Sequence, residues 1–122
     1  MGPYGAIQCD GSEYHGRYAE NMTEQELMEF HKPRIDCLVE ASCDLLAIET
    51  IPCYKEAASI MNLLKTYYPD VKAWLTFSCK VCHKQKSSIL KFILNFILRI
   101  QSIFLMVKPL KAFTIHLKIT LN

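Results

Sequence analysis

Residues 44–53 read DLLAIETIPC, and this stretch decides the fold class. Asp44 precedes a nearly continuous apolar run that ends at Glu49, a pattern typical of a strand buried on both faces of a parallel sheet. Residues 71–78, VKAWLTFS, are rich in β-branched and aromatic side chains and are predicted to form a second strand. Ligands of such sheets gather at the carboxyl ends of the strands, where Glu49 and Ser78 would lie.

Helical patterns flank the first of these strands. Residues 23–26, TEQE, have the form of a capping box, which predicts a helix that begins there and runs to about residue 42 in spite of Pro33. Residues 54–67 return to helical spacing before Pro69. Helix, strand, helix and strand in this order predict an α/β fold with parallel strands in βαβ units. The expected buried face of the first helix consists of Leu27, Phe30, Ile35, Leu38 and Ala41.

The amino-terminal residues favour irregular structure. Residues 2–14 are rich in Gly, Pro, Asp and Ser and are predicted to form a long loop. Residues 1–19 contain no basic segment followed by an apolar run, so we expect no secretory signal and a cytoplasmic protein. In that reducing compartment the cysteines are expected to be free thiols or small buried side chains. They are Cys9, Cys37, Cys43, Cys53, Cys79 and Cys82.

The charged side chains divide the chain in two near Cys79. Residues 1–79 carry six Lys or Arg and twelve Asp or Glu, whereas residues 80–122 carry eight Lys or Arg and no acidic side chain. The net charge of +2 argues against a nucleic-acid-binding protein held by a broad basic surface. We therefore predict a partial α/β domain over residues 1–79 and a basic apolar tail of separate origin over residues 80–122.

Five blocks in the first part of the chain resemble one known family. They are GPYGA at 2–6, DGSEY at 10–14, FHKPRI at 30–35, DLLAIETIPC at 44–53 and KAWLTFSCK at 72–80. In this order and spacing they are similar to the homocysteine-binding domain of the homocysteine S-methyltransferases. The resemblance implies a (β/α)8 TIM barrel, a fold that needs about 250 residues. We therefore expect only the central βαβ units of the barrel, followed by a helical or irregular tail.

The resemblance also implies an activity that this chain is not equipped to perform alone. The family transfers a methyl group from S-methylmethionine or a similar donor to homocysteine, forming methionine, and most members bind a catalytic zinc through three cysteines. Those cysteines belong to Gly-Gly-Cys-Cys and Asn-Cys motifs, neither of which occurs here. We therefore assign no catalytic residue and no metal ligand, and we expect the chain alone to bind no zinc and to be inactive.

Glu49 is the one residue that we assign to a substrate. The resemblance implies that this strand-end glutamate binds the amino group of homocysteine, and an ammonium in a partly desolvated site does favour a carboxylate acceptor. Without the rest of the barrel, binding should be weak or absent. The alternative for Glu49 is an exposed glutamate that caps the next helix. Thr50 and Ser78 are weaker candidates, because their hydroxyls can equally satisfy local backbone groups.

Residues 79–83, CKVCH, match the C-x-x-C-H pattern of covalent haem attachment. Haem would require export, for which no signal is visible, so we attribute the match to chance. Cys79, Cys82 and His83 could also hold zinc with His116 or another cysteine as a fourth ligand, but a single C-x-x-C pair is weak support for such a site. His15, His31 and His116 are each predicted to be ordinary surface or helix residues.

The tail leaves one alternative function open. Residues 89–107 have a helical pattern, and Lys91 and Arg99 within it argue against a membrane-spanning helix but allow one that lies on an anionic membrane surface. The alternative is thus a non-catalytic interaction or membrane-surface protein. We prefer to interpret the tail as a segment without selected function, similar to translated AT-rich noncoding sequence. A partial barrel leaves edges uncovered, so self-association is also expected.

Overall fold

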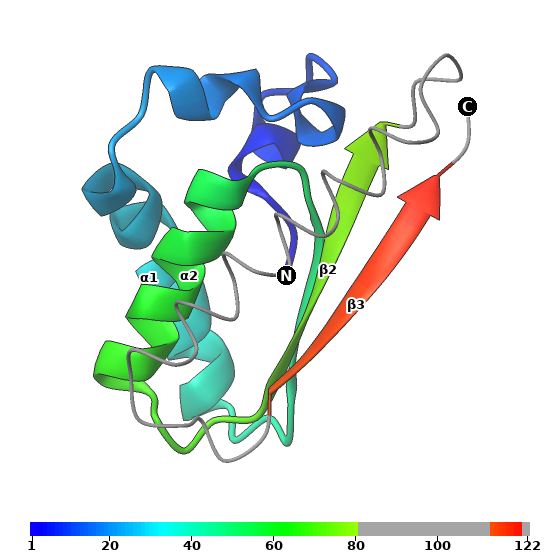
Figure 1. Cartoon of the computed structure of the whole chain (residues 1–122). Helices are drawn as coiled ribbons and strands as arrows, with labels where there is room; N and C mark the ends of the chain where they lie inside the picture. The colour runs from blue at the N-terminus through cyan, green and yellow to red at the C-terminus, as the bar shows by residue number, and fades with distance from the viewer. Residues whose placement is uncertain (81–112, 121–122) are drawn as a thin grey trace.

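The computed structural model describes residues 1–78 in full and the backbone of residues 79–80 and 113–120 (Figure 1). Three strands form one sheet in the order β1-β2-β3, and both neighbouring pairs are parallel. Strand β1 spans Leu46–Ile51, β2 spans Ala73–Lys80 and β3 spans Phe113–Thr120. The expected α/β class with parallel βαβ units is confirmed.

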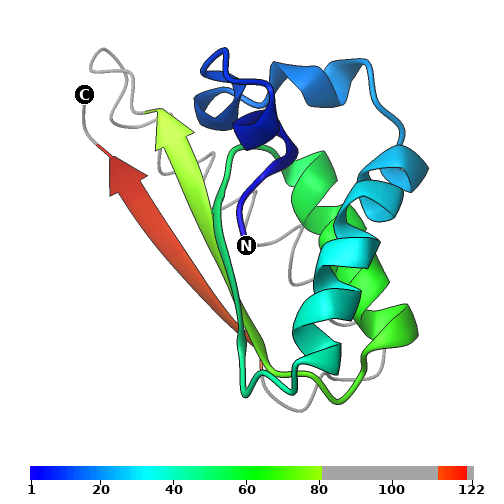
Figure 2. The ribbon, with the colours of Figure 1, turned by 180° about the vertical axis from the view of Figure 1, so that it is seen from behind.

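Two helices cover the same face of this sheet, as the two opposite views agree (Figures 1 and 2). Helix α1 spans Glu24–Glu40, and α2 spans Tyr54–Tyr67 and connects β1 to β2. Three short 3-10 turns precede them: η1 at Tyr4–Ile7, η2 at Ser12–Tyr14 and η3 at Arg17–Glu20. The predicted long amino-terminal loop is therefore a series of tight turns near the carboxyl end of β1.

Helix α1 begins where its sequence predicts. The Thr23 hydroxyl accepts a hydrogen bond from the Glu26 N–H at 3.1 Å, and the Glu26 carboxylate accepts one from the Thr23 N–H at 2.7 Å. The buried stripe, however, consists of Leu27, His31 and Ile35, while Leu38 is exposed. The predicted face was wrong at Leu38 and Ala41, which are both exposed, because the fully buried side chains of α1 form one row of residues four positions apart.

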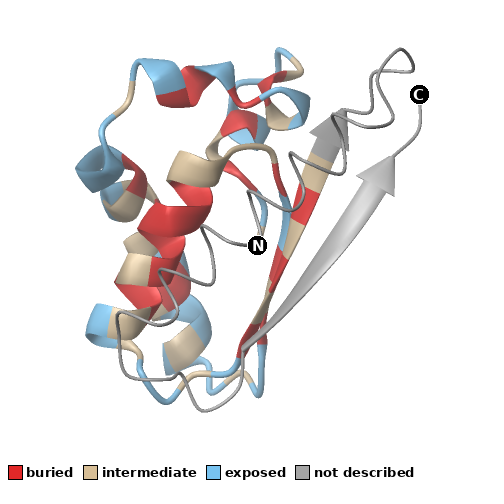
Figure 3. Ribbon diagram, viewed as in Figure 1, coloured by how far each residue is buried: buried red, intermediate tan, exposed pale blue. Residues whose placement is uncertain are grey.

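Strand β1 begins and ends two residues later than predicted, so Glu49 lies inside it. The prediction that this strand is buried on both faces was wrong. Only one face of β1 is buried, because both helices lie on that side (Figure 3). Leu46, Ile48 and Ile51 are fully buried, whereas Glu49 is exposed. The larger hydrophobic core lies between this face and the helices and includes Ile35, Leu46, Ile48, Ile51, Ile60, Leu63, Leu64, Leu75 and Phe77.

Strand β3 comes from the tail, which was predicted to be helical or irregular. That prediction was wrong for residues 113–120, whose backbone pairs with β2 from Ala73↔Phe113 to Lys80↔Thr120. The sequence FTIHLKIT alternates polar and apolar residues, which is the strand period. The helix expected at 89–107, together with Cys82 and His83, lies outside the described residues. The proposed boundary after residue 79 stays a prediction.

Candidate functional site

The carboxyl end of β1 departs from regular strand geometry. The register with β2 shifts between Ile48 and Ile51, and Thr50 has a positive φ of 65°. The Thr50 N–H donates a hydrogen bond to the Thr76 hydroxyl at 3.0 Å, which holds this bend in place. A β-branched residue rarely adopts positive φ, and backbone conformations of this kind concentrate at functional sites.

Glu49 lies beside this bend, on the wall of a cavity of about 330 Å³. The Trp74 Nε1–H donates to Glu49 Oε1 at 3.3 Å, and the Glu49 N–H donates to the Met1 carbonyl at 2.9 Å. The carboxylate is therefore oriented by a neighbouring strand while it stays exposed to a ligand. The cavity is lined by Met1, Gly2, Pro3, Ala6, Glu13, Tyr14, Glu49 and Thr50.

Glu13 contributes a second carboxylate to the wall of this cavity. Asp10 accepts a hydrogen bond from the Ser12 N–H at 2.9 Å, and hydrogen bonding by Ser12 holds the pKa of the Asp10 carboxyl below its usual range. The Ser12 hydroxyl donates to the Gly5 carbonyl at 3.2 Å and so joins η1 to η2. Glu13 Oε2 is buried without a hydrogen-bond partner among the described residues. In the sequence Glu13 stands out only as part of the DGSEY block, and no local pattern predicts its place in this wall.

A buried carboxylate, Glu56, holds the turns that form this wall against both helices. Glu56 Oε1 accepts from the Tyr4 N–H at 2.6 Å and lies 2.8 Å from His31 Nε2, and Glu56 Oε2 accepts from the Tyr18 hydroxyl. Burial, together with the hydrogen bond to Glu56, raises the pKa of Tyr18 above its ordinary value. Glu56 and His31 are both fully buried. The expectation that His31 is an ordinary surface or helix residue missed this contact.

The other predicted candidates divide between the cavity and the surrounding fold. Thr50 lines the cavity, whereas the half-buried Ser78 on β2 does not. Burial raises the pKa of the Cys53 thiol, which argues against a reactive thiolate at that position. The expectation of free thiols is confirmed for the cysteines whose side chains are described, namely Cys9, Cys37, Cys43 and Cys53.

Comparison with known proteins assigns the family. The family model described as homocysteine S-methyltransferase matches residues 1–96. The chain belongs to this family. The homocysteine S-methyltransferase YbgG of Bacillus subtilis is 55% identical over 80 residues, which are 66% of this chain and 24% of that protein. The betaine-homocysteine S-methyltransferase of Drosophila melanogaster is 46% identical over 79 residues, 65% of this chain and 24% of that protein.

A solved homocysteine methyltransferase supports the same assignment. The metallated form of MmuM from Escherichia coli superposes with a TM-score of 0.60 at 44% identity, covering 64% of this chain and 26% of that one. The chain thus spans about a quarter of the length of the curated relatives it matches. Its βαβ units correspond to part of a TIM-barrel enzyme, which confirms the expected family and the partial extent of the match.

The solved structure of MmuM is a metallated form, and the described side chains of this family member offer no candidate site for a metal. No group of three His, Cys, Asp or Glu side chains that could hold a metal occurs among the residues with described side chains. Cys79 and His116 belong to β2 and β3, where Thr76 is the backbone partner of His116. The expectation that the chain binds neither zinc nor haem stays a prediction. In the described part of the chain, no helix has the length and apolarity needed to cross a bilayer.

Proposed function

We propose that this chain supplies the part of a homocysteine S-methyltransferase that binds the amino group of homocysteine, with Glu49 as its acceptor. The proposal rests mainly on the place of Glu49, which is an exposed carboxylate on the wall of a cavity at the carboxyl end of a parallel strand. In the complete enzyme the reaction would transfer a methyl group from S-methylmethionine or a similar donor to homocysteine, forming methionine.

The polar groups around the cavity suit the ammonium group of an amino acid. An ammonium has three N–H donors and no acceptor, so it needs oxygen atoms around it. Glu49 offers a carboxylate that Trp74 already orients, and Glu13 in the same wall supplies a second negative charge. Hydrogen bonds between an ammonium and a carboxylate are about twice as strong as neutral ones, which favours an amino acid over its uncharged analogues.

We further propose that this chain by itself does not catalyse methyl transfer. A thiol with an ordinary pKa of about 8.5 is mostly protonated at neutral pH and is then a weak nucleophile. In the family a metal held by cysteines makes the thiolate, and the motifs that carry those cysteines do not occur in this sequence. The purified chain, supplied with S-methylmethionine, homocysteine and zinc, should therefore form no methionine. Measurable methionine formation would contradict this proposal.

The binding role of Glu49 can be tested by calorimetric titration of the chain with homocysteine under reducing conditions. Glu49→Gln should weaken binding about tenfold, equivalent to about 1.4 kcal/mol, because the charged acceptor is lost. Glu40→Gln is the matched control, since Glu40 is an exposed glutamate at the end of α1, away from the cavity. It should leave the affinity unchanged.

A ligand without the amino group separates recognition of the ammonium from general weakening. 4-Mercaptobutanoate has the thiol and the carboxylate of homocysteine but no ammonium. It should bind the unsubstituted chain and the Glu49→Gln variant equally weakly. If Glu49→Gln weakens binding of homocysteine and of 4-mercaptobutanoate to the same extent, Glu49 does not bind the ammonium.

A further inference from the structure

Strand β1 contains one extra residue at its carboxyl end, next to the candidate site. The register pairs on either side of this point are Ile48↔Leu75 and Ile51↔Phe77. Glu49 and Thr50 therefore lie together opposite the single residue Thr76. Two residues opposite one form a β-bulge, which is rare between parallel strands and changes the direction of the side chains in the bulged strand.

The bulge brings two consecutive residues of β1 to the same cavity. In a regular strand, neighbouring side chains point to opposite faces of the sheet. Here Glu49 and Thr50 are both exposed and both line the cavity of about 330 Å³, and Ile51 is again fully buried. The bulge therefore allows β1 to return to the hydrophobic core directly after the residues that face the site.

This bulge is strained, and a side chain of β2 holds it. Thr50 has a φ of 65°, which a β-branched residue rarely adopts and which persists only where the surrounding structure imposes it. The Thr76 hydroxyl accepts a hydrogen bond from the Thr50 N–H at 3.0 Å. The strained residue is thus bonded to a side chain of the neighbouring strand at the point where the register shifts.

Strand β2 also contacts the Glu49 carboxylate directly. The Trp74 Nε1–H donates to Glu49 Oε1 at 3.3 Å. Trp74 and Thr76 are two residues apart, so they lie on the same face of β2. The other face of β2 is packed in the core, where Leu75 and Phe77 are buried. Both contacts with the bulge therefore come from a firmly packed strand.

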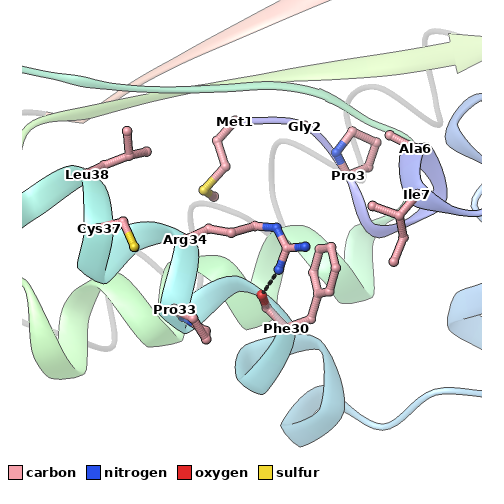
Figure 4. Close-up of a pocket in the computed structure, with 10 residues that line it drawn as sticks. All are labelled: Met1, Gly2, Pro3, Ala6, Ile7, Phe30, Pro33, Arg34, Cys37 and Leu38. Carbon is pink, nitrogen blue, oxygen red and sulfur yellow. Dashed lines mark hydrogen bonds between the residues drawn. The ribbon is translucent and has the colours of Figure 1, made fainter.

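The neighbour of Glu49 on the other side is less firmly packed. The Glu49 N–H donates to the Met1 carbonyl at 2.9 Å. The amino-terminal segment separates the site cavity from a groove of about 640 Å³ against α1 (Figure 4). The residues that line both hollows are Met1, Gly2, Pro3 and Ala6. With a hollow on either side, this segment fixes the position of Glu49 less firmly than β2 does.

We infer that Thr76 is a positioning residue for the amino-acid site. Its hydroxyl keeps the bulge in this conformation, and the bulge keeps the Glu49 carboxylate in the cavity wall, where Trp74 orients it. Thr76 does not line the cavity, so it acts through Glu49 and does not touch the ligand. The expected effect on homocysteine rests on the proposed function of Glu49, whereas the effect on the position of the carboxylate involves no ligand.

The position of Glu49 can be measured without a ligand, because Trp74 is the only tryptophan of the chain. Its indole N–H gives a single signal in a proton–nitrogen NMR spectrum, and this signal reports the hydrogen bond to Glu49. Thr76→Val keeps the shape of the side chain but removes the acceptor for the Thr50 N–H. We expect the indole signal to shift in the same direction as in Glu49→Gln. Thr76→Ser, which retains a hydroxyl, should restore the original position.

A direct effect of Thr76 on the nearby indole is separated from an effect through Glu49 by a double variant. In the Glu49→Gln background, Thr76→Val should cause no further shift. Thr66→Val is the matched control, because Thr66 is exposed in the last turn of α2 and lies outside the sheet. It should leave the signal in place. Circular dichroism shows whether each variant keeps its helices, and Thr76→Ala, which removes the same acceptor, is measured if Thr76→Val does not fold.

Calorimetric titration measures the consequence for the ligand. Thr76→Val should weaken homocysteine binding about fivefold, because the carboxylate is retained but displaced. Thr76→Ser should bind homocysteine as the unsubstituted chain does. 4-Mercaptobutanoate has no ammonium, so its affinity should be the same for all three chains.

Two results would overturn the inference. The first is an indole signal that stays in place in Thr76→Val, or that shifts equally in the Glu49→Gln background. The second is equal weakening of homocysteine and 4-mercaptobutanoate binding by Thr76→Val, which would indicate a general loss of structure. If the signal shifts as expected but the unsubstituted chain does not bind homocysteine, the positioning role holds and the proposed function fails. The two failures are therefore distinguishable.

Discussion

At the scale of single residues, the fold depends on one fully buried carboxylate. Glu56 receives donors from three separate segments: the Tyr4 N–H, the Tyr18 hydroxyl and His31 on α1. A buried carboxylate is costly unless such partners satisfy it, and removal of the charge leaves the partners unsatisfied. Because Tyr4 and Tyr18 flank the turns that carry Glu13, Glu56 also fixes the wall of the candidate site.

Glu56→Gln tests this role. We expect it to lower the free energy of unfolding by about 3 kcal/mol, because the amide has one acceptor oxygen where three donors converge. Urea unfolding followed by circular dichroism measures the change. Glu40→Gln, on the exposed end of α1, should stay within about 0.5 kcal/mol of the unsubstituted chain. Equal effects of the two substitutions would show that the buried contacts contribute nothing specific.

At the scale of elements, α1 depends on the reciprocal hydrogen bonds between Thr23 and Glu26. Thr23→Ala removes the acceptor for the Glu26 N–H and should lower the free energy of unfolding by about 1 kcal/mol. Urea unfolding at neutral pH measures this loss. Since the amino end of α1 is exposed, the loss should come from the cap alone and leave the hydrophobic core unchanged.

The same cap predicts a dependence on pH. Hydrogen bonds from the Thr23 N–H and hydroxyl hold the pKa of the Glu26 carboxyl below its usual range. A carboxyl whose pKa is lowered by folding stabilises the fold above its unfolded pKa, and that stabilisation is lost as the pH falls through the folded pKa. In Glu26→Gln, the free energy of unfolding should therefore fall less steeply as the pH is lowered, as urea unfolding at a series of pH values would measure. If the free energy of unfolding falls with pH in Glu26→Gln as steeply as in the unsubstituted chain, the pH dependence does not come from Glu26.

The contact between turns η1 and η2 gives a second prediction at this scale. A Cβ added at Gly5 would lie 2.5 Å from the Glu13 nitrogen and 2.7 Å from Tyr18 Cε1. Gly5→Ala should therefore cost about 1–3 kcal/mol and displace the backbone that carries Glu13. Gly2→Ala is the control, since nothing lies within 4 Å of its added Cβ. Thermal unfolding of the two variants measures the difference, and equal melting temperatures would contradict the close approach.

At the scale of the whole molecule, strand β3 covers the outer edge of β2. All eight residues of β3 pair with β2, so an edge that could join another chain is occupied. Removal of residues 113–122 should expose the alternate β2 amides that face β3 and speed their hydrogen exchange about tenfold, equivalent to about 1.4 kcal/mol. Mass-spectrometric exchange over residues 73–80 measures this. Unchanged exchange after truncation would show that β3 does not protect β2.

Local patterns in the sequence were enough for most of the fold. The capping box at Thr23, the helical spacing over residues 54–67 and the apolar runs before Glu49 and Ser78 depend on neighbouring residues, so they can be recognised without knowledge of distant contacts. The predicted helix over 54–67 is confirmed to the residue, and α1 begins as predicted. Both β1 and β2 begin and end two residues later than predicted. The reason is that pairing between the strands determines where each one begins and ends, and this pairing includes the bulge near Thr50.

The sequence by itself determined the α/β class, the family and the candidate residue Glu49, because each depends on local order along the chain. Only the tertiary structure brought Glu13 into the same cavity wall and placed His31 and Tyr18 on Glu56, from which they are 25 and 38 residues away. Residues 113–120 have the alternating local pattern of a strand, but only the tertiary structure placed them beside β2. The physical reason is that these contacts form when distant segments pack together, and no short stretch of sequence encodes its partner across such a distance.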